Sequence, residues 1–323
     1  MFRGRSSQMR AIANPEGLRD REQTMTLTGL HLLLTYQCNL ECDHCFVWGS
    51  PWQTGTMTLR GIRDILGQAK DLGTIDWIYF EGGEPFLYYS LLLRGARLTR
   101  RMGFRVGIVS NGFWATEVDD AVECLRPFRG IVDDLSVSSD LFHWTAAQGR
   151  LAENAREAAR RIGIPVGVIR IAQPEERAPP SEGQLPAGES AVMFRGRAAE
   201  KLVAKTGRRS WTTFTSCPHE NLEDPGRVHV DPLGNVHVCQ GVSIGNLFRT
   251  PLKELVMAYR PQVHPILGPL VAGGPAELVR RHGLEHQRGY VDACHLCYEA
   301  RRTLRGRFGE ILAPNQMYGV VEE

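Results

Sequence analysis

The sequence predicts an α/β fold in which a partial (β/α)6 barrel of the TIM type is followed by a small C-terminal α+β domain. Between about residues 29 and 171, short apolar runs alternate with segments whose apolar residues recur at helical spacing. Repeated units of this kind, with short connections, imply parallel strands joined by right-handed crossovers. After about residue 200 the alternation ends, and a β-hairpin, short helices and four further cysteines follow.

The barrel strands are expected in five clear apolar segments and a weaker sixth. They are residues 29–36, 75–80, 104–110, 133–139 and 164–172, with the sixth at 190–194. The first strand is an apolar run that ends just before a cysteine, as expected of a buried strand. The second strand is rich in β-branched and aromatic residues and is followed by a Gly-Gly turn.

Four helices are expected between these strands. The first begins after Thr58, a good N-cap residue, and its apolar residues between Leu59 and Ala69 fall on one face. The others are expected over residues 90–102, 116–125 and 151–162. Thr116 and Asp119 form a capping-box-like start for the third helix.

The chain is expected to divide into four parts. They are a poorly ordered polar extension (1–28), the barrel (29–200), the C-terminal domain (201–313) and a short tail (314–323). Residues 173–189 are polar and rich in proline, which predicts a surface loop or lid. In the C-terminal domain, residues 227–240 predict a β-hairpin, and residues 251–260 predict a helix that begins with a proline.

Composition excludes several classes of partner and compartment. A formal net charge of +2 over 323 residues does not favour nucleic-acid binding. No apolar run approaches the length of about 20 residues that spans a bilayer, and the N-terminus lacks a signal peptide. We therefore expect a cytoplasmic protein with neither a nucleic-acid nor a membrane partner. Eight cysteines in a reducing compartment favour metal-binding thiolates over disulfides.

Chemistry in such a barrel is expected on the loops after the carboxyl ends of the strands. That rule selects five segments, residues 38–45, 81–85, 110–114, 138–144 and 170–173. The first of them contains Cys38, Cys42 and Cys45 in the spacing C-x3-C-x2-C. Three thiolates and His44 could hold a structural zinc ion. Alternatively, the three thiolates could hold a [4Fe–4S] cluster with one iron left open for a ligand.

The cysteine triplet directly after a first strand resembles the signature of the radical S-adenosylmethionine (radical SAM) superfamily. The segment Glu81-Gly-Gly-Glu-Pro85 resembles the motif with which that family binds the amino group of SAM. The resemblance therefore implies that Gly82, Gly83 and Glu84 contact SAM. By the same resemblance, the cofactor-binding set also includes Ser110 and Asn111, Ser138 and Asp140 at the ribose, His44 beside the adenine, and Arg170. Strand-end capping is the alternative role for Ser138 and Asp140.

The resemblance also implies a reaction. A cluster on the three thiolates would bind SAM at its open iron and cleave it reductively, giving a 5′-deoxyadenosyl radical that abstracts hydrogen from a substrate. The electron would come from a low-potential donor such as flavodoxin or ferredoxin. The substrate would be a small molecule or a peptide, the latter delivered by a separate recognition protein. A non-catalytic, metal-stapled interaction module is the alternative from another class.

The four C-terminal cysteines form a second candidate metal site. Cys239 ends the predicted hairpin, five residues after Gly234, while Cys217 precedes it and the pair Cys294 and Cys297 follows. This arrangement resembles the twitch domain, a shortened SPASM domain, and implies an auxiliary [4Fe–4S] cluster that accepts an electron from the substrate. A zinc staple would use the same ligands. The remaining Cys124 is interpreted as a small buried residue of a helix.

Substrate residues are expected among aromatic and polar side chains near the strand ends. The candidates are Trp48, Trp52, Glu81, Phe113, Trp114, His143, Trp144 and Arg170. His143 and Arg170 could bind an anionic group, although Arg170 could equally contact the carboxylate of SAM.

Overall fold

A computed structural model describes residues 25–143, 150–174 and 189–320 of the chain. One nine-stranded sheet organises the molecule, in the order β10-β9-β8-β1-β2-β3-β4-β5-β6. The strands are β1 (Gly29–Thr35), β2 (Trp77–Gly82), β3 (Arg105–Ser110), β4 (Asp134–Ser138), β5 (Val166–Ile171), β6 (Glu189–Ser190), β8 (Arg227–Val230), β9 (Asn235–Cys239) and β10 (Val242–Asn246). From β8 to β6 all neighbours are parallel, whereas β9 and β10 are antiparallel. A separate two-stranded sheet pairs β7 (Arg209–Ser210) with β11 (Gly289–Tyr290).

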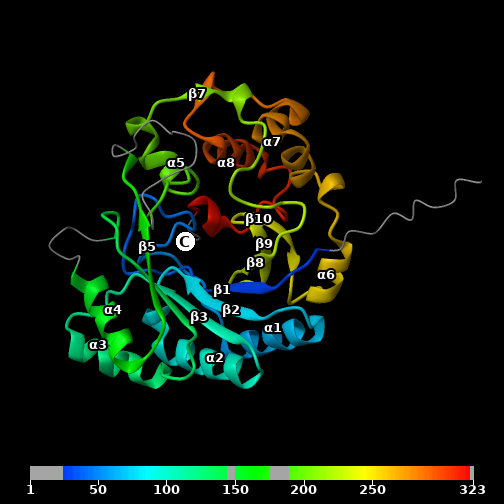
Figure 1. Ribbon diagram of the computed structural model, residues 1–323. Coiled ribbons are helices and arrows are strands. Elements are labelled where there is room, and N and C mark those ends of the chain that lie inside the picture. Colours follow the sequence, from blue (N-terminus) through cyan, green and yellow to red (C-terminus); the bar gives the residue numbers. More distant parts are fainter. Residues whose placement is uncertain (1–24, 144–149, 175–188, 321–323) are drawn as a thin grey trace, which may run out of the picture.

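The helices lie on two sides of this sheet (Figure 1). They are α1 (Leu59–Leu72), α2 (Tyr89–Arg101), α3 (Val118–Leu125), α4 (Arg150–Ile162), α5 (Ala198–Lys201), α6 (Leu252–Ala258), α7 (Leu267–His282) and α8 (Ala293–Leu304). Helices α1 to α4 cover the outer face of the parallel strands, while α5, α7 and α8 lie across the open side of the partial barrel. The alternation of strands and helices up to β5 confirms the predicted α/β fold with a mostly parallel sheet.

Local sequence explains the first unit of the barrel. In β1 every residue except His31 is buried, which accounts for the continuous apolar run. Thr58 caps α1 as expected, because its side chain accepts a hydrogen bond from the amide of Gly61 at 3.0 Å. The helix ends at Gly73, whose φ of 80° lies in the left-handed region that glycine adopts without strain.

Two local predictions differ from the structure. The N-cap of α3 is Glu117, whose side chain makes no capping hydrogen bond, so the capping box at Thr116 and Asp119 was wrong. The Thr116 hydroxyl instead contacts the carboxylate of Asp120 at 3.4 Å. The sixth strand is also shorter than expected, because it covers only Glu189–Ser190. The predicted loop at 173–189 lies mostly outside the described residues.

The C-terminal hairpin continues the barrel sheet. Strand β8 pairs in parallel with β1, so His31 lies beside His229 in the sheet. Residues before β1 join the same edge, since the amide of Thr28 donates to the carbonyl of Gly226 at 2.8 Å. Met25 and Leu27, in the extension that was expected to be poorly ordered, are buried in the core. The domain boundary near residue 200 stays a prediction.

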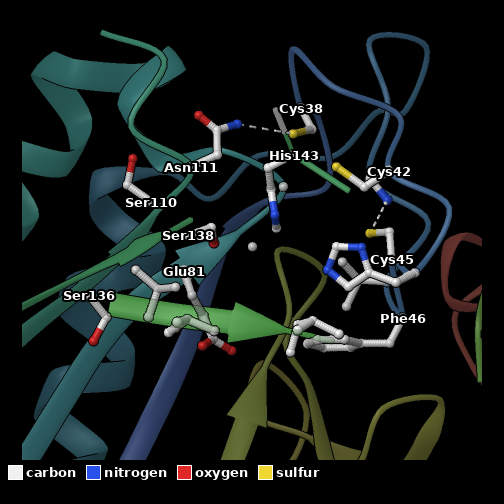
Figure 2. A pocket seen from close by; sticks show the side chains of 18 of the residues that line it. Cys38, Cys42, Cys45, Phe46, Glu81, Ser110, Asn111, Ser136, Ser138 and His143 are labelled. Carbon is white, nitrogen blue, oxygen red and sulfur yellow. Dashed lines mark hydrogen bonds between the residues drawn. The ribbon is translucent and has the colours of Figure 1, made fainter. Parts of the chain in front are cut away.

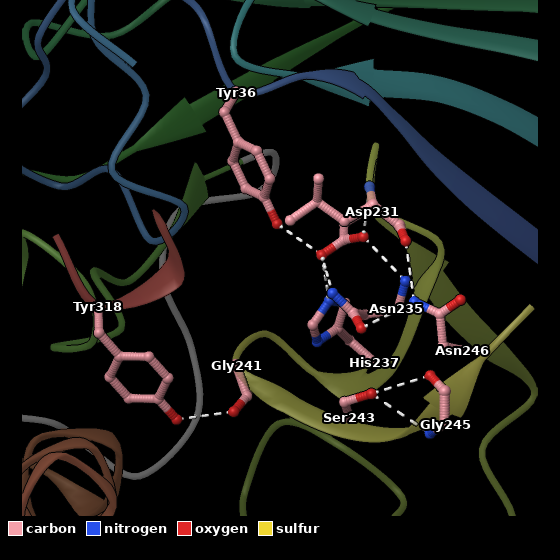
Figure 3. A network of polar contacts seen from close by, with 10 residues as sticks. Tyr36, Asp231, Asn235, His237, Gly241, Ser243, Gly245, Asn246 and Tyr318 are labelled. Carbon is pink, nitrogen blue, oxygen red and sulfur yellow. Dashed lines mark hydrogen bonds and ion pairs between the residues drawn. The ribbon is translucent and has the colours of Figure 1, made fainter. Parts of the chain in front are cut away.

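A buried polar network also holds the hairpin against the barrel (Figure 3). The Tyr36 hydroxyl, just beyond β1, donates to a carboxylate oxygen of Asp231 at 3.0 Å. The same oxygen lies 3.2 Å from Nε2 of His237 and 2.9 Å from the side-chain amide of Asn235. Burial raises the pKa of Asp231, but the contacts with His237 and Asn235 outweigh it and hold that pKa below its usual value. The ionised carboxylate therefore ties the hairpin turn to the first barrel strand.

None of the helices in the described ranges is long and apolar enough to cross a membrane.

Candidate functional site

A cavity of about 570 Å³ opens inside the partial barrel at the carboxyl ends of its strands (Figure 2). All five segments selected by the strand-end rule contribute to its wall. Their lining residues include the three cysteines of the first loop, Gly82 and Gly83, Ser110 and Asn111, Ser138 and His143, and Ile171. The rule therefore located the cavity, because the parallel strands bring their following loops to one edge.

The three cysteines of residues 38–45 form one wall of this cavity. The amide of Leu40 donates to Sγ of Cys38 at 3.4 Å, and the amide of Gly49 donates to Sγ of Cys45 at 3.2 Å. Burial raises the pKa of the Cys38 thiol to about 12 and that of Cys42 still further. Without a cation these thiols would hold their protons, whereas a metal that displaced the protons would be stabilised by the amide donors.

The spread of the thiols favours a cluster over a single ion. In a tetrahedral zinc site, with bonds of about 2.3 Å, the sulfur atoms lie about 3.8 Å apart. Among the described residues, several groups of three His, Cys, Asp or Glu side chains have ligand atoms that all lie within 4.8 Å of one another. The three cysteines of this triplet are not one of these groups. No fourth cysteine is among the described residues that line the cavity. The residues present therefore fit a larger group with three thiolate ligands.

His44 does not join the thiols as a fourth ligand. Its ring lies 4.5 Å from that of Phe142 and 5.0 Å from that of His143, measured between centroids. Burial and the neighbouring His143 lower the pKa of His44 to about 4, so the ring is neutral near pH 7. Its Nδ1 atom is buried without a hydrogen-bond partner among the described residues. A neutral, partly unsatisfied ring on the cavity wall suits contact with a planar polar group.

The two glycines after β2 are required by the backbone of the first loop. Gly82 has a φ of 136°, and a Cβ atom there would lie 2.4 Å from the carbonyl oxygen of Thr35. A Cβ atom at Gly83 would lie 2.1 Å from the carbonyl oxygen of Gln37. The amide of Gly83 also donates a hydrogen bond to the carbonyl oxygen of Thr35, at 2.7 Å. This close approach fixes the thiol loop against the end of β2.

Glu84 lies behind the cavity wall. Its carboxylate accepts hydrogen bonds from the amide of Asn111 at 2.7 Å, the amide of Phe86 at 3.0 Å and the hydroxyl of Ser110 at 2.9 Å. Burial raises the pKa of Glu84 to about 7, despite these three donors. The described contacts therefore make Glu84 a brace between the ends of β2 and β3. Its predicted contact with SAM stays a prediction.

Asn111 and Asp140 orient their neighbours. The side-chain amide of Asn111 donates to Asn39 at 2.9 Å and lies 3.8 Å from Sγ of Cys38. Asp140 accepts from Nδ1 of His143 at 2.8 Å and from the amide of Ile171 at 3.3 Å. Burial raises the pKa of Asp140, but His143 outweighs this effect and lowers it. Asp140 thus holds His143 in the cavity wall, while Ser138 lines the cavity directly.

Several residues that were predicted to contact a cofactor or substrate do not line the cavity. Ile169 and Ile171 line the cavity, so the intervening Arg170 faces the other side of β5 and is exposed. Its predicted contact with a cofactor or substrate stays a prediction. Trp52 is 72% exposed. Trp48 is turned toward the C-terminal region, where its ring nitrogen donates to the Tyr298 hydroxyl at 2.8 Å.

Two further aromatic candidates do not line the cavity, whereas Phe46 and Tyr79 do. Trp114 stacks on Phe86 at 4.6 Å, and neither it nor Phe113 lines the cavity. Trp144 lies outside the described residues. The lining residues that sequence reasoning missed lie on the strands themselves, in the loop after the cysteine triplet or just after β6. They include His31, Tyr79, Asp134, Ser136, Arg227, Phe46 and residues 191–193. His31 could have been found from the sequence, because it is a polar residue within the apolar run of β1.

The four C-terminal cysteines gather around a second, smaller cavity. Cys239 ends β9, and Cys294 and Cys297 lie on the first two turns of α8. The guanidinium of Arg195 donates to Sγ of Cys239 at 3.1 Å. Burial raises the pKa of Cys297 to about 11 and also raises the pKa of Cys217 and Cys294. Four thiols, one buried and three partly buried, form with a cationic donor a candidate metal centre that has no large cavity beside it.

Residues 195–197 connect the two groups of thiols. While Arg195 contacts Cys239, the amide of Arg197 donates to the carbonyl of Cys45 at 2.9 Å. The guanidinium of Arg197 donates to the carbonyls of Cys42 at 2.7 Å and Gly49 at 2.9 Å. Gly196, with a φ of 60°, could not carry a Cβ atom, which would lie 2.5 Å from Cα of Phe46. One short segment therefore touches both sites.

A partial barrel with a thiol triplet beside its central cavity defines an enzyme-like scaffold for a metal cofactor. Residues 32–172 match the model of the Radical SAM superfamily. This part of the chain, 141 of its 323 residues, is therefore similar to that superfamily.

Curated relatives share part of this region. The chain is 30% identical over 129 residues to the "Putative peptide biosynthesis protein YydG" of Bacillus subtilis (strain 168), covering 40% of each chain. It is 33% identical over 109 residues to an "S-adenosylmethionine-dependent nucleotide dehydratase" of Thermoplasmatales archaeon (strain ISO4-H5), covering 32% of this chain and 34% of that protein. These matches span two fifths or less of the relatives' length.

Similar solved structures include BtrN in complex with AdoMet and 2-DOIA, at a TM-score of 0.46 and 16% identity, covering 71% of this chain and 82% of that chain. Another is methylornithine synthase (PylB), at a TM-score of 0.36 and 13% identity, covering 46% of each chain.

Proposed function

We propose that the chain is a radical SAM oxidoreductase whose triplet Cys38, Cys42 and Cys45 holds a [4Fe–4S] cluster. The observation that carries this proposal is the thiol wall of the cavity. Three thiols, whose sulfur atoms are not all within 4.8 Å of one another, face a space of about 570 Å³. When bound, the cluster supplies the electron that cleaves SAM and yields a 5′-deoxyadenosyl radical, which abstracts hydrogen from the substrate.

The chain's own residues have positioning roles in this proposal. The amides of Leu40 and Gly49 stabilise negative charge on Cys38 and Cys45. The neutral ring of His44 and the hydroxyl of Ser138 face the cavity where a nucleoside would bind. The apolar lining excludes water from the reacting groups and holds them in a fixed geometry. The electron would be delivered by a low-potential donor such as flavodoxin or ferredoxin.

The second group of thiols, Cys217, Cys239, Cys294 and Cys297, is proposed to hold an auxiliary [4Fe–4S] cluster in a twitch-like or SPASM-like domain. The segment 195–197 supports a role as electron acceptor, because it bridges the surroundings of both groups of thiols. The buried Arg195 would stabilise added negative charge at the auxiliary site. The substrate would then undergo a net two-electron oxidation.

A peptide is the second candidate substrate, favoured by the similarity to the putative peptide biosynthesis protein of B. subtilis. In that case the chain would form a cross-link in a peptide that a separate recognition protein delivers. A small-molecule substrate remains the first candidate, because the cavity inside the partial barrel, at about 570 Å³, has the size of a small-ligand site.

Formation of 5′-deoxyadenosine tests the proposed function. The protein is reconstituted anaerobically with iron and sulfide, reduced with dithionite and incubated with SAM. We expect 5′-deoxyadenosine by mass spectrometry and about eight iron atoms per chain, four per cluster. A protein that binds iron at the triplet but forms no deoxyadenosine would contradict the proposal. A colourless protein that binds zinc instead would support the metal-stapled interaction module.

A further inference from the structure

Three side chains from adjacent strands meet within the barrel, away from the thiols. His31 lies on β1, Glu81 on β2 and His229 on β8. In the sheet His31 is the direct neighbour of His229 on one side and of Tyr79 on the other. Glu81 is two residues after Tyr79 and points to the same face. The cluster therefore depends on the pairing of β8 with β1, which joins residues about 200 positions apart.

The ligand atoms of this cluster are close enough to share one ion. Nδ1 of His31 lies 3.1 Å from Oε2 of Glu81, and Nε2 of His229 lies 3.1 Å from Oε1 of the same carboxylate. One ligand atom from each residue lies within 4.8 Å of the others. Separations of about 3 Å between donors are those of ligands bonded to one zinc or iron ion at about 2.0–2.2 Å.

The one carboxylate of the cluster lies between the two imidazoles, with a different oxygen atom 3.1 Å from each ring. Arg227, which also lines the cavity, is paired with Glu220 at 3.6 Å. Tyr79, which stacks on His31 at 4.7 Å, donates its hydroxyl to Asp134 at 3.2 Å. Arg227 and Asp134 thus have partners of their own, and the carboxylate of Glu81 is the one that lies between the two imidazoles.

A fourth donor lies beside His229. The side-chain nitrogen of Gln240 is 3.3 Å from Nε2 of His229, while its side-chain oxygen is buried with no hydrogen-bond partner among the described residues. The two ends of an amide side chain have nearly the same shape, so turning this group exchanges their positions. The turned amide would direct a neutral oxygen toward the cluster.

We propose that His31, Glu81 and His229 bind a divalent transition-metal ion of the zinc or ferrous-iron class. Two imidazoles and one carboxylate are ligands that such ions prefer, and they leave coordination positions open. Since His31 and Glu81 line the cavity, an open position faces the same space as the three thiols. The ion would bind an oxygen atom of a substrate, such as a carboxylate, carbonyl or hydroxyl. This site shares no ligand with either group of cysteines.

Zinc binding to the reconstituted protein tests this site, and its outcome does not depend on SAM cleavage. The protein with its iron–sulfur sites filled is incubated with Zn²⁺ under anaerobic conditions and freed of loose metal by gel filtration. We expect about one retained zinc per chain, with an X-ray absorption shell of nitrogen and oxygen at about 2.0–2.1 Å. No retained zinc, or a shell of sulfur alone at about 2.3 Å, would overturn the proposal.

Matched variants connect the ion to these residues. Glu81→Gln and His31→Ala should each weaken zinc binding by at least about tenfold, with the iron content unchanged. Asp134→Asn alters another carboxylate of the same cavity, one that is paired with Tyr79, and should leave zinc binding intact. Equal zinc binding in all four proteins would contradict the assignment, because zinc would then be held elsewhere.

Discussion

The two groups of thiols differ in how the chain builds them and in what lies beside them. Cys38, Cys42 and Cys45 come from one loop of eight residues and face a cavity of about 570 Å³. The other four come from residues 217 to 297, and an arginine side chain contacts one of them. One site is open to a ligand and the other is enclosed, so we infer chemistry at the first and electron transfer at the second.

Substitution of the open site should have the largest effect. Cys42→Ala removes one of three cluster ligands, so 5′-deoxyadenosine formation should fall to the background of the protein-free control. Mass spectrometry of the anaerobic reaction measures it. The matched control is Cys124→Ala, which removes a thiol of α3 that belongs to neither group. Comparable activity in the two variants would mean that the triplet does not hold the reactive cluster.

Substitution of the enclosed site should separate the two roles. Cys297→Ala should lose about four of about eight irons yet still cleave SAM, because the ligands of the open site are untouched. Iron analysis and deoxyadenosine assays are made on the same sample. If deoxyadenosine formation is lost as completely as in Cys42→Ala, the division between a reactive and an electron-accepting site fails.

Disturbing the close backbone contact between Gly83 and the loop of the three thiols should lower the stability of the fold. Gly83→Ala would drive a Cβ atom against the carbonyl oxygen of Gln37, at 2.1 Å in the present backbone. We expect the free energy of unfolding to fall by roughly 2–4 kcal/mol, measured by urea denaturation. Gly67→Ala is the control, because that helical position has no atom within 4 Å of the added carbon. It should be neutral or stabilising by up to about 1 kcal/mol, and similar losses in both variants would argue against the close packing of the thiol loop.

The arginine beside the enclosed site should tune its reduction potential. Arg195→Gln removes a buried cation that donates to Sγ of Cys239 at 3.1 Å. Because the cation favours the more negative, reduced state, its loss should lower the potential of the auxiliary cluster. A shift of roughly 60 mV or more is expected for a one-electron couple. A redox titration followed by electron paramagnetic resonance measures it, with the surface variant Arg302→Ala as control; equal potentials in all proteins would remove this role.

Features built from contiguous residues could be predicted from the sequence, whereas features built from distant residues could not. The apolar run of β1, the helical face after Thr58 and the cysteine triplet are contiguous in sequence, so the barrel strands and the thiol wall could be predicted. The parallel pairing of β8 with β1 is long-range and leaves no local pattern. For that reason the meeting of His31 with His229 was missed.

The predicted residues that do not line the cavity also have a physical explanation. The strand-end rule correctly selected the loops but does not say which way each side chain points. Alternation along β5 turns Arg170 away from the cavity, while Trp48 and Trp114 pack into other parts of the molecule. Residues on the inner face of the strands, such as Tyr79 and Asp134, complete the wall instead. Their role depends on the curvature of the sheet, which sequence patterns do not report.

The most direct measurement is electron paramagnetic resonance of the reduced Cys297→Ala protein with and without SAM. Only the cluster of the open site should contribute to this spectrum. We predict that SAM changes the spectrum, and that an isotope label in its carboxylate or amino group gives a hyperfine coupling to the cluster. A cluster whose spectrum is unchanged by SAM, with no such coupling, would contradict the central claim that the three-thiol site leaves one iron open for this ligand.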